Sequence, residues 1–597
     1  MLSTWLVTLV FVLGAVATIS EHGIIRRAPA TPFSLPTRDS NPKARAEAVK
    51  LKRQGILYGP GPDQNRTAFP TGPLGDPIWQ IDLANLSAEQ EEHSKIVNKD
   101  AQLVLQALKQ AGGLRSLADY SKLYDQQWKN SMGNLVDNSF FANYTHDLYF
   151  SMQRLTINPF AIRRLKPYSG LPFKVDDTVA RKVATKTVKQ LLQSGRLFYV
   201  DHTAISKLPR QAGRFAASCE AYFYIHPQSD DFLPLAVKPN EGSDLVYTPA
   251  DSAHDWLLAK ILFGQNDVWD TPWRHFASSH MVVELPYLAA QRCMGDNHPV
   301  LGIYKRLMFN AFALRYFIQT RLYAPGTFVD QLYAFSGRSA MQYTVGLYEN
   351  GENEFQANYF ANRLEKAGLL NSPFGPPLKH FPYADDARTI ESALRSFMTT
   401  LVHSYYTEPD SIADDQELTC WFEEVKTAGS VDFPDPNEGD YISRTTLIDI
   451  LTHVAYLNAV QHQAMNNNDQ FINALVPLSP MALYKPLPTK KGLSENELLS
   501  SLPNATQSVG QLGLAAAFSR PEFVDSGRTL MKAFSDADLL LSLNDETKRA
   551  AGVFESSMRK LSAEIESRGF DGEGLCRGAP FLWRALDPKV ALFTMSI

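Results

Sequence analysis

The chain is poor in cysteine and has no long run of basic residues. Only Cys219, Cys293, Cys420 and Cys576 occur among 597 residues. Four cysteines exclude a disulfide framework and allow at most two bridges, and no pair has the spacing of a zinc site. The net charge is −5. This charge argues against a nucleic-acid partner, because such proteins usually carry a basic surface.

Strongly apolar runs are also missing, except at the start of the chain. Residues 6–15 are apolar, and Ala15-Val16-Ala17 fits a small-x-small cleavage site. The run is shorter than the roughly 20 residues of a membrane span. We therefore interpret residues 1–17 as a signal peptide rather than a membrane anchor, although no Lys or Arg precedes the run. We expect no other transmembrane segment and an extracellular protein.

Four sequons agree with a secreted glycoprotein, although each alone is a weak signal. Their acceptor residues are Asn65, Asn85, Asn143 and Asn504.

The rest of the sequence predicts one large, mainly helical domain. Hydrophobic residues make up 44% of the chain, which is enough for a large core. Residues 18–86 are rich in Pro and Gly and predict an extended N-terminal segment. Ser87-Ala88-Glu89-Gln90 then predicts a capped helix that runs through Leu108, and helical spacing dominates residues 87–597. Three strand-like stretches predict one small β-sheet: residues 197–201, 219–225 and 233–237.

Two histidine-containing pairs on apolar helices are candidate metal ligands. His275 and His280 are five residues apart, which turns their side chains about 140° away from each other in an ideal α-helix. A π-type turn removes most of that mismatch, so the pair predicts a distorted helix around residues 276–279. His462 and Asn466 are four apart and share one face of an ordinary helix. A single helical His is more often a hydrogen-bonded core or surface residue, but two pairs favour a metal site.

The chain terminus supplies a fifth candidate donor, the α-carboxylate of Ile597. Imidazole, amide and carboxylate donors without a thiolate suit octahedral iron or manganese, and five donors leave a sixth place for water or hydroxide. Such a redox site could remove hydrogen from a weak bis-allylic C–H bond. We leave His453 out because it lies on roughly the opposite helix face from His462. His298 precedes Pro299 and reads as a loop or helix-start residue.

Several ordered blocks make the chain resemble the lipoxygenases from about Asp147 to Ile597. Their order and spacing, together with the free terminus, are highly specific. The blocks are Asp147-Leu148-Tyr149-Phe150-Ser151-Met152-Gln153-Arg154-Leu155, Asn158-Pro159, Ile162-Arg163-Arg164-Leu165, Trp256-Leu257-Leu258-Ala259-Lys260, His275-x4-His280-x3-Glu284 with Arg292 and His298-Pro299, Phe381-Pro382-Tyr383-Ala384-Asp385-Asp386, His462-Gln463-Ala464-Met465-Asn466 and the terminal Ile597.

The resemblance implies a lipoxygenase-like catalytic domain over residues 87–597. It implies dioxygenation of polyunsaturated fatty acids, here linoleic or α-linolenic acid, to hydroperoxides. In that reaction a metal(III)-hydroxide abstracts hydrogen and O2 adds to the pentadienyl radical. The implied metal ligands are His275, His280, His462, Asn466 and Ile597.

The start of the chain refines the resemblance. Residues 1–90 are too short and too rich in Pro and Gly for the N-terminal β-barrel of plant and animal lipoxygenases. With the secretion signal and sequons, this looks like the fungal manganese lipoxygenases. The resemblance therefore implies manganese, with iron as the alternative because both use the same ligand types. Two rival functions are a hydroperoxide isomerase with the same fold and a non-catalytic secreted lipid-binding protein.

Residues that assist the metal or the substrate are harder to choose. Arg520 and Lys485 are candidates for binding the substrate carboxylate, against the simpler reading as surface cations. Glu284 and Arg292 are candidates for hydrogen bonds around the metal ligands, or for a structural ion pair. Five aromatic residues could line a lipid channel or belong to the core: Phe317, Tyr323, Phe328, Tyr333 and Phe335.

Overall fold

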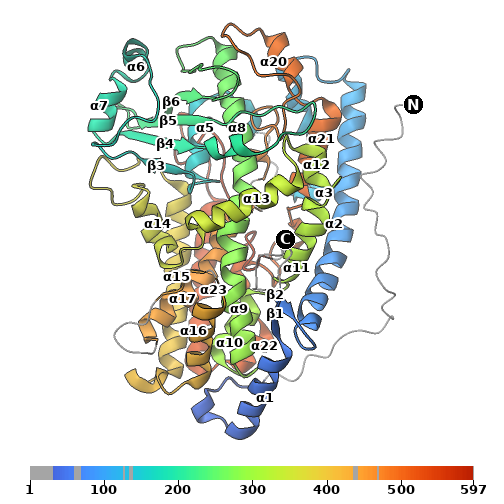
Figure 1. Ribbon diagram of the computed structural model, residues 1–597, viewed down its shortest axis with the longest axis vertical. Coiled ribbons are helices and arrows are strands. Elements are labelled where there is room, and N and C mark those ends of the chain that lie inside the picture. The colour runs from blue at the N-terminus through green and yellow to red at the C-terminus, as the bar shows by residue number, and fades with distance from the viewer. Residues whose placement is uncertain are drawn as a thin grey trace.

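A computed structural model gives the fold of the chain (Figure 1). The structure describes residues 31–59, 69–125, 128–133, 139–429, 431–434, 442–466 and 470–595. The predicted signal peptide, Asn65 and Ile597 lie outside the described residues.

One long interrupted helix forms the axis of the molecule. It consists of α8 (Ala253–His275), a π-helical turn (Phe276–His280) and α9 (Met281–Cys293). This axis runs through the middle of the molecule in Figure 1, with α2 along one side and α15, α17 and α23 along the other. Nearly every residue of the axis is buried, because helices pack against it from several sides.

The other helices surround this axis. They are α1 (Pro42–Gly55), α2 (Asp76–Gln110), α3 (Lys129–Met132), α4 (Ser139–Ala142), α5 (Asp147–Met152), α6 (Asp177–Ala184), α7 (Val188–Gln193), α10 (Pro299–Leu307), α11 (Ala313–Ile318), α12 (Phe328–Leu332), α13 (Gly337–Leu347), α14 (Phe360–Lys366), α15 (Pro382–Tyr405), α16 (Gln416–Ala428), α17 (Arg444–Tyr456), α18 (His462–Asn466), α19 (Gln470–Asn473), α20 (Glu495–Ser501), α21 (Ala505–Ala516), α22 (Ala537–Ser542) and α23 (Asp545–Glu566). Further π-helical turns are Gln319–Tyr323, Tyr348–Glu352 and Leu457–Gln461.

A four-stranded antiparallel sheet lies at one end of the molecule, in the order β3 (Ile162–Arg164), β4 (Leu197–Asp201), β5 (Glu220–Ile225) and β6 (Phe232–Lys238). The small predicted sheet is confirmed, with one strand more than expected, because β3 has only three residues. Alternation along β4 sends Phe198 into the main core and Tyr199 into a second cluster beside α6 and α7. Both faces of the sheet are therefore covered.

The N-terminal part of the chain is more helical than its composition indicated. The prediction of an extended segment is wrong for α1, whose start is capped by the Asn41 side chain. The expected helix start at Ser87 is also wrong, because α2 begins at Asp76, with a proline in its first turn. Ser87 lies inside α2, just after the buried Leu86. A second sheet, β1 (Leu57–Gly59) paired with β2 (Phe69–Thr71), lies between the two helices in sequence.

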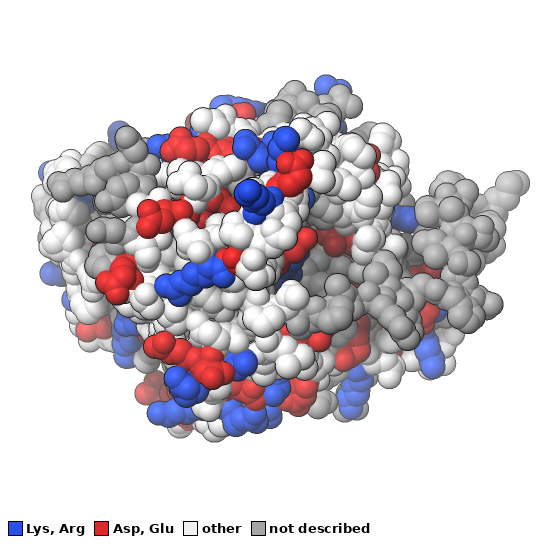
Figure 2. Space-filling view, turned by 90° about the horizontal axis from the view of Figure 1, so that it is seen from below, with Lys and Arg blue, Asp and Glu red and all other residues white. Residues whose placement is uncertain are grey.

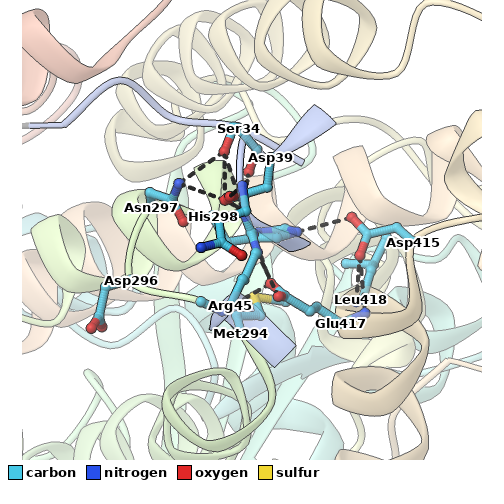
Figure 3. A network of polar contacts seen from close by, with 12 residues as sticks. Ser34, Asp39, Arg45, Met294, Asp296, Asn297, His298, Asp415, Glu417 and Leu418 are labelled. Atoms are coloured by element: carbon cyan, nitrogen blue, oxygen red, sulfur yellow. Dashed lines mark hydrogen bonds and ion pairs between the residues drawn. The ribbon is translucent and has the colours of Figure 1, made fainter. Parts of the chain in front are cut away.

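A buried arginine attaches this N-terminal region to the helical core, as Figure 3 shows. Arg45 of α1 donates from Nε to Glu417 of α16 at 2.6 Å, and from a second nitrogen to the other carboxylate oxygen at 2.8 Å. It also donates to Asp39 at 3.0 Å. The same Glu417 accepts from the backbone N–H of Gly295, just after α9. Arg45, Asp39, Glu417 and their hydrogen bonds therefore form an N-terminal clip that holds α1 against α9 and α16.

A disulfide joins the same two core helices. Cys293 at the end of α9 is bonded to Cys420 of α16, whereas Cys219 and Cys576 are buried free thiols. The cysteine count allowed up to two bridges without specifying their pairing. The end of the axis is therefore fixed covalently, next to the N-terminal clip.

The visible surface carries both charge signs. In the view from below, acidic and basic side chains are interspersed, with white residues between them (Figure 2). Within the described ranges, no helix combines the length and apolar character needed to span a bilayer.

Arg45→Met tests the N-terminal clip. Removing the guanidinium leaves two carboxylates in a buried site without their cation, so we expect a loss of about 3–5 kcal/mol in the free energy of unfolding. Arg559→Met is the control, because Arg559 pairs with Glu555 at the surface with 62% of its side chain exposed, and such pairs contribute under about 1 kcal/mol. Denaturant titration measures both. Equal losses would contradict the structural role of the clip.

Candidate metal centre

The first two candidate ligands flank the π-helical turn in the axis of the molecule. His275 is the last residue of α8, and His280 ends the π turn Phe276–His280. The distorted helix predicted from their five-residue spacing is confirmed. The wider turn brings the two imidazole rings to 5.4 Å between centroids, which an undistorted helix would not allow.

A second π turn carries the third histidine into the same place. The turn Leu457–Gln461 lies between α17 and α18, and His462 follows it directly. Its ring centroid lies 5.1 Å from that of His275 and 4.8 Å from that of His280. One ring nitrogen from each of the three lies within 4.8 Å of the others. No sequence signal marks this second turn, because the spacing of His462 to Asn466 suits an ordinary helix.

The three imidazoles are buried and uncharged. Burial lowers the pKa of His275 to about 3 and holds the pKa values of His280 and His462 well below the usual range. Both ring nitrogens of His280 and Nε2 of His462 have no hydrogen-bond partner among the described residues. Buried polar atoms normally have a partner. A cation that accepts lone pairs from neutral imidazoles would satisfy these atoms, so the donor set fits a transition metal.

The other two predicted ligands are placed less fully. Asn466 ends α18, one helical turn after His462, and its side chain is buried. Ile597 lies outside the described residues. The described part of the tail contacts the same helix: Nε2 of Gln463, next to His462, donates to the Thr594 carbonyl at 3.0 Å.

The two histidines that the sequence analysis set aside lie outside the cluster. His298 caps α10 and its Nε2 faces Asp415 at 2.9 Å, as expected for a helix-start residue. His453 on α17 has its ring against Phe355 and Tyr359, with centroids 4.7 and 4.9 Å away. His298 therefore caps a helix, and His453 packs in the core.

Glu284 and Arg292 both form ion pairs in the helical core. Glu284, one turn after His280, pairs with the buried Arg315 of α11. Arg292 pairs with Glu424 at 2.6 Å and lies over the Tyr58 ring.

A small apolar pocket lies next to the first π turn. Phe276, which follows His275 and begins this turn, and Met281, which follows His280, form part of its wall. Of the aromatic residues considered for a channel, Tyr323 lines this pocket, whereas Tyr333 and Phe335 pack against Trp269 in the core. The other lining residues carried no recognisable sequence signal: Arg315, Ile318, Gln319, Met341, Thr344 and Val345.

The two cations considered for the substrate carboxylate are not in the lining of this pocket. Arg520 is buried and donates to the carbonyls of Ala517 and Ser519 at 2.7 and 2.6 Å. Burial lowers its pKa to about 10, so it stays charged at neutral pH. Lys485 is exposed and lines a separate surface hollow.

Three of the four sequons fall on described residues. Asn85 on α2 and Asn504, which caps α21, are exposed, and Asn143 is half-buried. Their modification stays a prediction.

The chain is similar to known proteins of one family over almost its whole length. The lipoxygenase family model matches residues 94–571. A manganese lipoxygenase of Nakataea oryzae is 39% identical over 95% of this chain and 92% of its own length. One of Fusarium oxysporum is 38% identical over 97% and 95%. A solved structure named manganese lipoxygenase superposes with a TM-score of 0.92 at 37% identity and covers 95% of this chain and 100% of its own.

His462→Ala tests whether the three imidazoles bind an ion. We expect the purified wild-type chain to hold about one transition-metal ion and the variant to lose most of it, because three neutral buried donors become two. Elemental analysis of the purified protein measures this. His453→Phe, which changes a buried His outside the cluster, should keep the ion. Full occupancy in His462→Ala would exclude His462 as a ligand.

Proposed function

Because this chain belongs to the lipoxygenase family, we propose that it is a manganese lipoxygenase that adds O2 to polyunsaturated fatty acids and forms hydroperoxides. One observation carries the proposal. Three neutral, buried imidazoles converge, and the residues that follow His275 and His280 line an apolar pocket, in a chain that superposes on a manganese lipoxygenase over 95% of its length.

The proposed ligands are His275, His280, His462, Asn466 and the terminal carboxylate of Ile597. The unpartnered nitrogens of His280 and His462 support the first group, and the buried position of Asn466 one turn after His462 supports the amide. The contact between Gln463 and Thr594 supports a tail that ends near α18. Iron would accept the same donors. The assignment of manganese therefore depends on the similarity to manganese lipoxygenases. When bound, the metal supplies the one-electron chemistry that makes removal of a bis-allylic hydrogen feasible.

The pocket residues bind and orient the acyl chain. Phe276, Met281 and Ile318 give an apolar wall against which methylene groups pack without loss of hydrogen bonds to water. The charge of Arg315 in this wall is neutralised by Glu284. The wall formed by these residues therefore favours a hydrocarbon chain over a carboxylate. Exclusion of water beside the imidazoles protects the carbon radical that hydrogen removal leaves.

Arg520 is the stronger candidate for binding the substrate carboxylate. Its guanidinium is buried, and Nε and Nη2 have no partner within the described part of the chain. A buried cation with free N–H groups binds a carboxylate through charge-assisted hydrogen bonds. Lys485 remains the second candidate, since an exposed ammonium is already solvated by water. We propose linoleic and α-linolenic acid as substrates, because both contain the pentadiene unit that the chemistry requires.

We further propose that the protein acts outside the cell after removal of residues 1–17. The disulfide Cys293–Cys420 supports this setting, because such bonds persist in oxidising compartments. The exposed Asn85 and Asn504 support glycosylation, since acceptor residues must be accessible.

Incubation of the purified protein with linoleate tests the function. We expect O2 uptake, a conjugated-diene hydroperoxide product and about one manganese ion per chain. His280→Ala is the control and should lack both ion and turnover. Iron in place of manganese would change the metal assignment. Consumption of added hydroperoxide without O2 uptake would indicate an isomerase, and binding of linoleate without any turnover would indicate a lipid-binding protein.

Addition of one glycine after Ile597 tests the terminal ligand. The extension moves the carboxylate by the length of one residue, about 3.5 Å, which is more than a metal–oxygen bond tolerates. We expect turnover to fall at least about 100-fold, beyond the loss seen when outer partners of a metal site are removed, with an unchanged circular dichroism spectrum. Ile597→Val, which keeps the carboxylate in place, should stay active. Full metal content and activity in the extended chain would contradict the assignment.

A further inference from the structure

The side chain of Gln461 joins the two π turns that carry the histidines. Gln461 is the last residue of the turn Leu457–Gln461 and is fully buried. Its Nε2 donates to Oγ of Ser278 at 2.8 Å and to the backbone carbonyl of Ser278 at 3.2 Å. Ser278 is in the middle of the other turn, Phe276–His280. The link therefore runs from the residue next to His462 to the segment between His275 and His280.

The contact adds a side-chain donor to the backbone of the π turn. A π turn disturbs the regular i→i+4 hydrogen bonding of the helix, and buried carbonyls need donors. The amide of Gln461 donates to the Ser278 carbonyl and hydroxyl of this turn, and the Ser278 hydroxyl in turn donates to the carbonyl of Arg274 at 2.8 Å. One side-chain amide therefore serves backbone and side chain of the same residue.

The orientation of the amide follows from its partners. With Oε1 turned toward Ser278, two carbonyl oxygens would face each other, so Nε2 must point there. Oε1 of Gln461 has no hydrogen-bond partner within the described ranges. The donor is thus the functional part of the side chain. On the same turn, Asn458 donates to the Leu307 carbonyl at 3.1 Å, which fixes the turn to a different element, the end of α10.

We propose that Gln461 is a positioning residue of the metal centre. Its hydrogen bonds to Ser278 hold the two π turns at a fixed separation, and so hold His462 at the distance from His275 and His280 that one ion requires. The inference rests on the proposed function of this site as a metal centre. It predicts that loss of the amide loosens the ion and alters its ligand geometry without changing the fatty-acid pocket, since Gln461 is not among the residues that line it.

Gln461→Leu in the full-length, manganese-loaded protein tests the proposal. We expect manganese to be lost to a chelator at least about 10-fold faster than from wild type, in the range found for outer partners of metal ligands. The electron paramagnetic resonance spectrum of bound Mn²⁺ should change, and kcat for linoleate should fall while KM stays within about 2-fold. Ser278→Ala should give a smaller change of the same kind, because the carbonyl contact remains.

Gln291→Leu is the matched control. Gln291 is a buried amide on α9 that donates to Tyr287 on the same helix at 2.7 Å, so its loss removes a hydrogen bond without separating the turns. We expect Gln291→Leu to lower Tm about as much as Gln461→Leu does. The rate of manganese loss to the chelator and the electron paramagnetic resonance spectrum should be those of the wild type.

Two results would overturn the proposal. One is wild-type ion release and an unaltered spectrum in Gln461→Leu. The other is equal effects of Gln291→Leu on both measurements. If Gln461→Leu does not fold, Ser278→Ala decides: an unchanged rate and spectrum there also overturn it. Wild-type protein without manganese or turnover would refute the proposed function, which is a different outcome.

Discussion

The arrangement of the helices around the axis depends on one constraint: three uncharged imidazoles must face one point in the buried interior. A single helix cannot present His275 and His280 to the same point at five-residue spacing, so the axis widens into a π turn. His462 arrives on a second helix that widens in the same way just before it. Gln461 donates to the Ser278 carbonyl in the first turn, and Asn458 attaches the second turn to the end of α10. An apolar pocket lies next to the first turn, because Phe276 begins this turn and Met281 follows it.

Contacts with other helices fix the position of this axis. At one end of α9 the disulfide Cys293–Cys420 and the N-terminal clip both attach to α16. Along its length, Glu284 pairs with Arg315 and thereby joins the axis to α11, which forms the pocket wall. The buried charges of Arg45 and Arg315 each have a carboxylate partner, which offsets the high free energy of a buried ion. The axis that carries His275 and His280 is therefore fixed to its neighbouring helices by both covalent and ionic contacts.

Sequence reasoning succeeded where the physical signal is local. The spacing of His275 and His280 predicted a widened turn, and three strand-like stretches predicted β4, β5 and β6. It failed for α1 and for the start of α2, because prolines that begin helices were read as loop formers. The turn before His462 and the pocket wall around Met341 and Val345 depend on which helices meet in space. Nothing in their own residues distinguishes them from ordinary helical core. The Glu284–Arg315 pair was missed for the same reason, since its partners come from separate helices.

The contact between Gln463 and Thr594 has a consequence for the order of folding. Phe593 and Thr594 are completely buried, and Thr594 accepts a hydrogen bond from the residue beside His462, 131 positions earlier in the chain. A contact between residues so far apart in sequence forms late, because a long loop must close before the contact can stabilise anything. The interior around His462 is therefore closed only when residues 593 and 594 dock against α18.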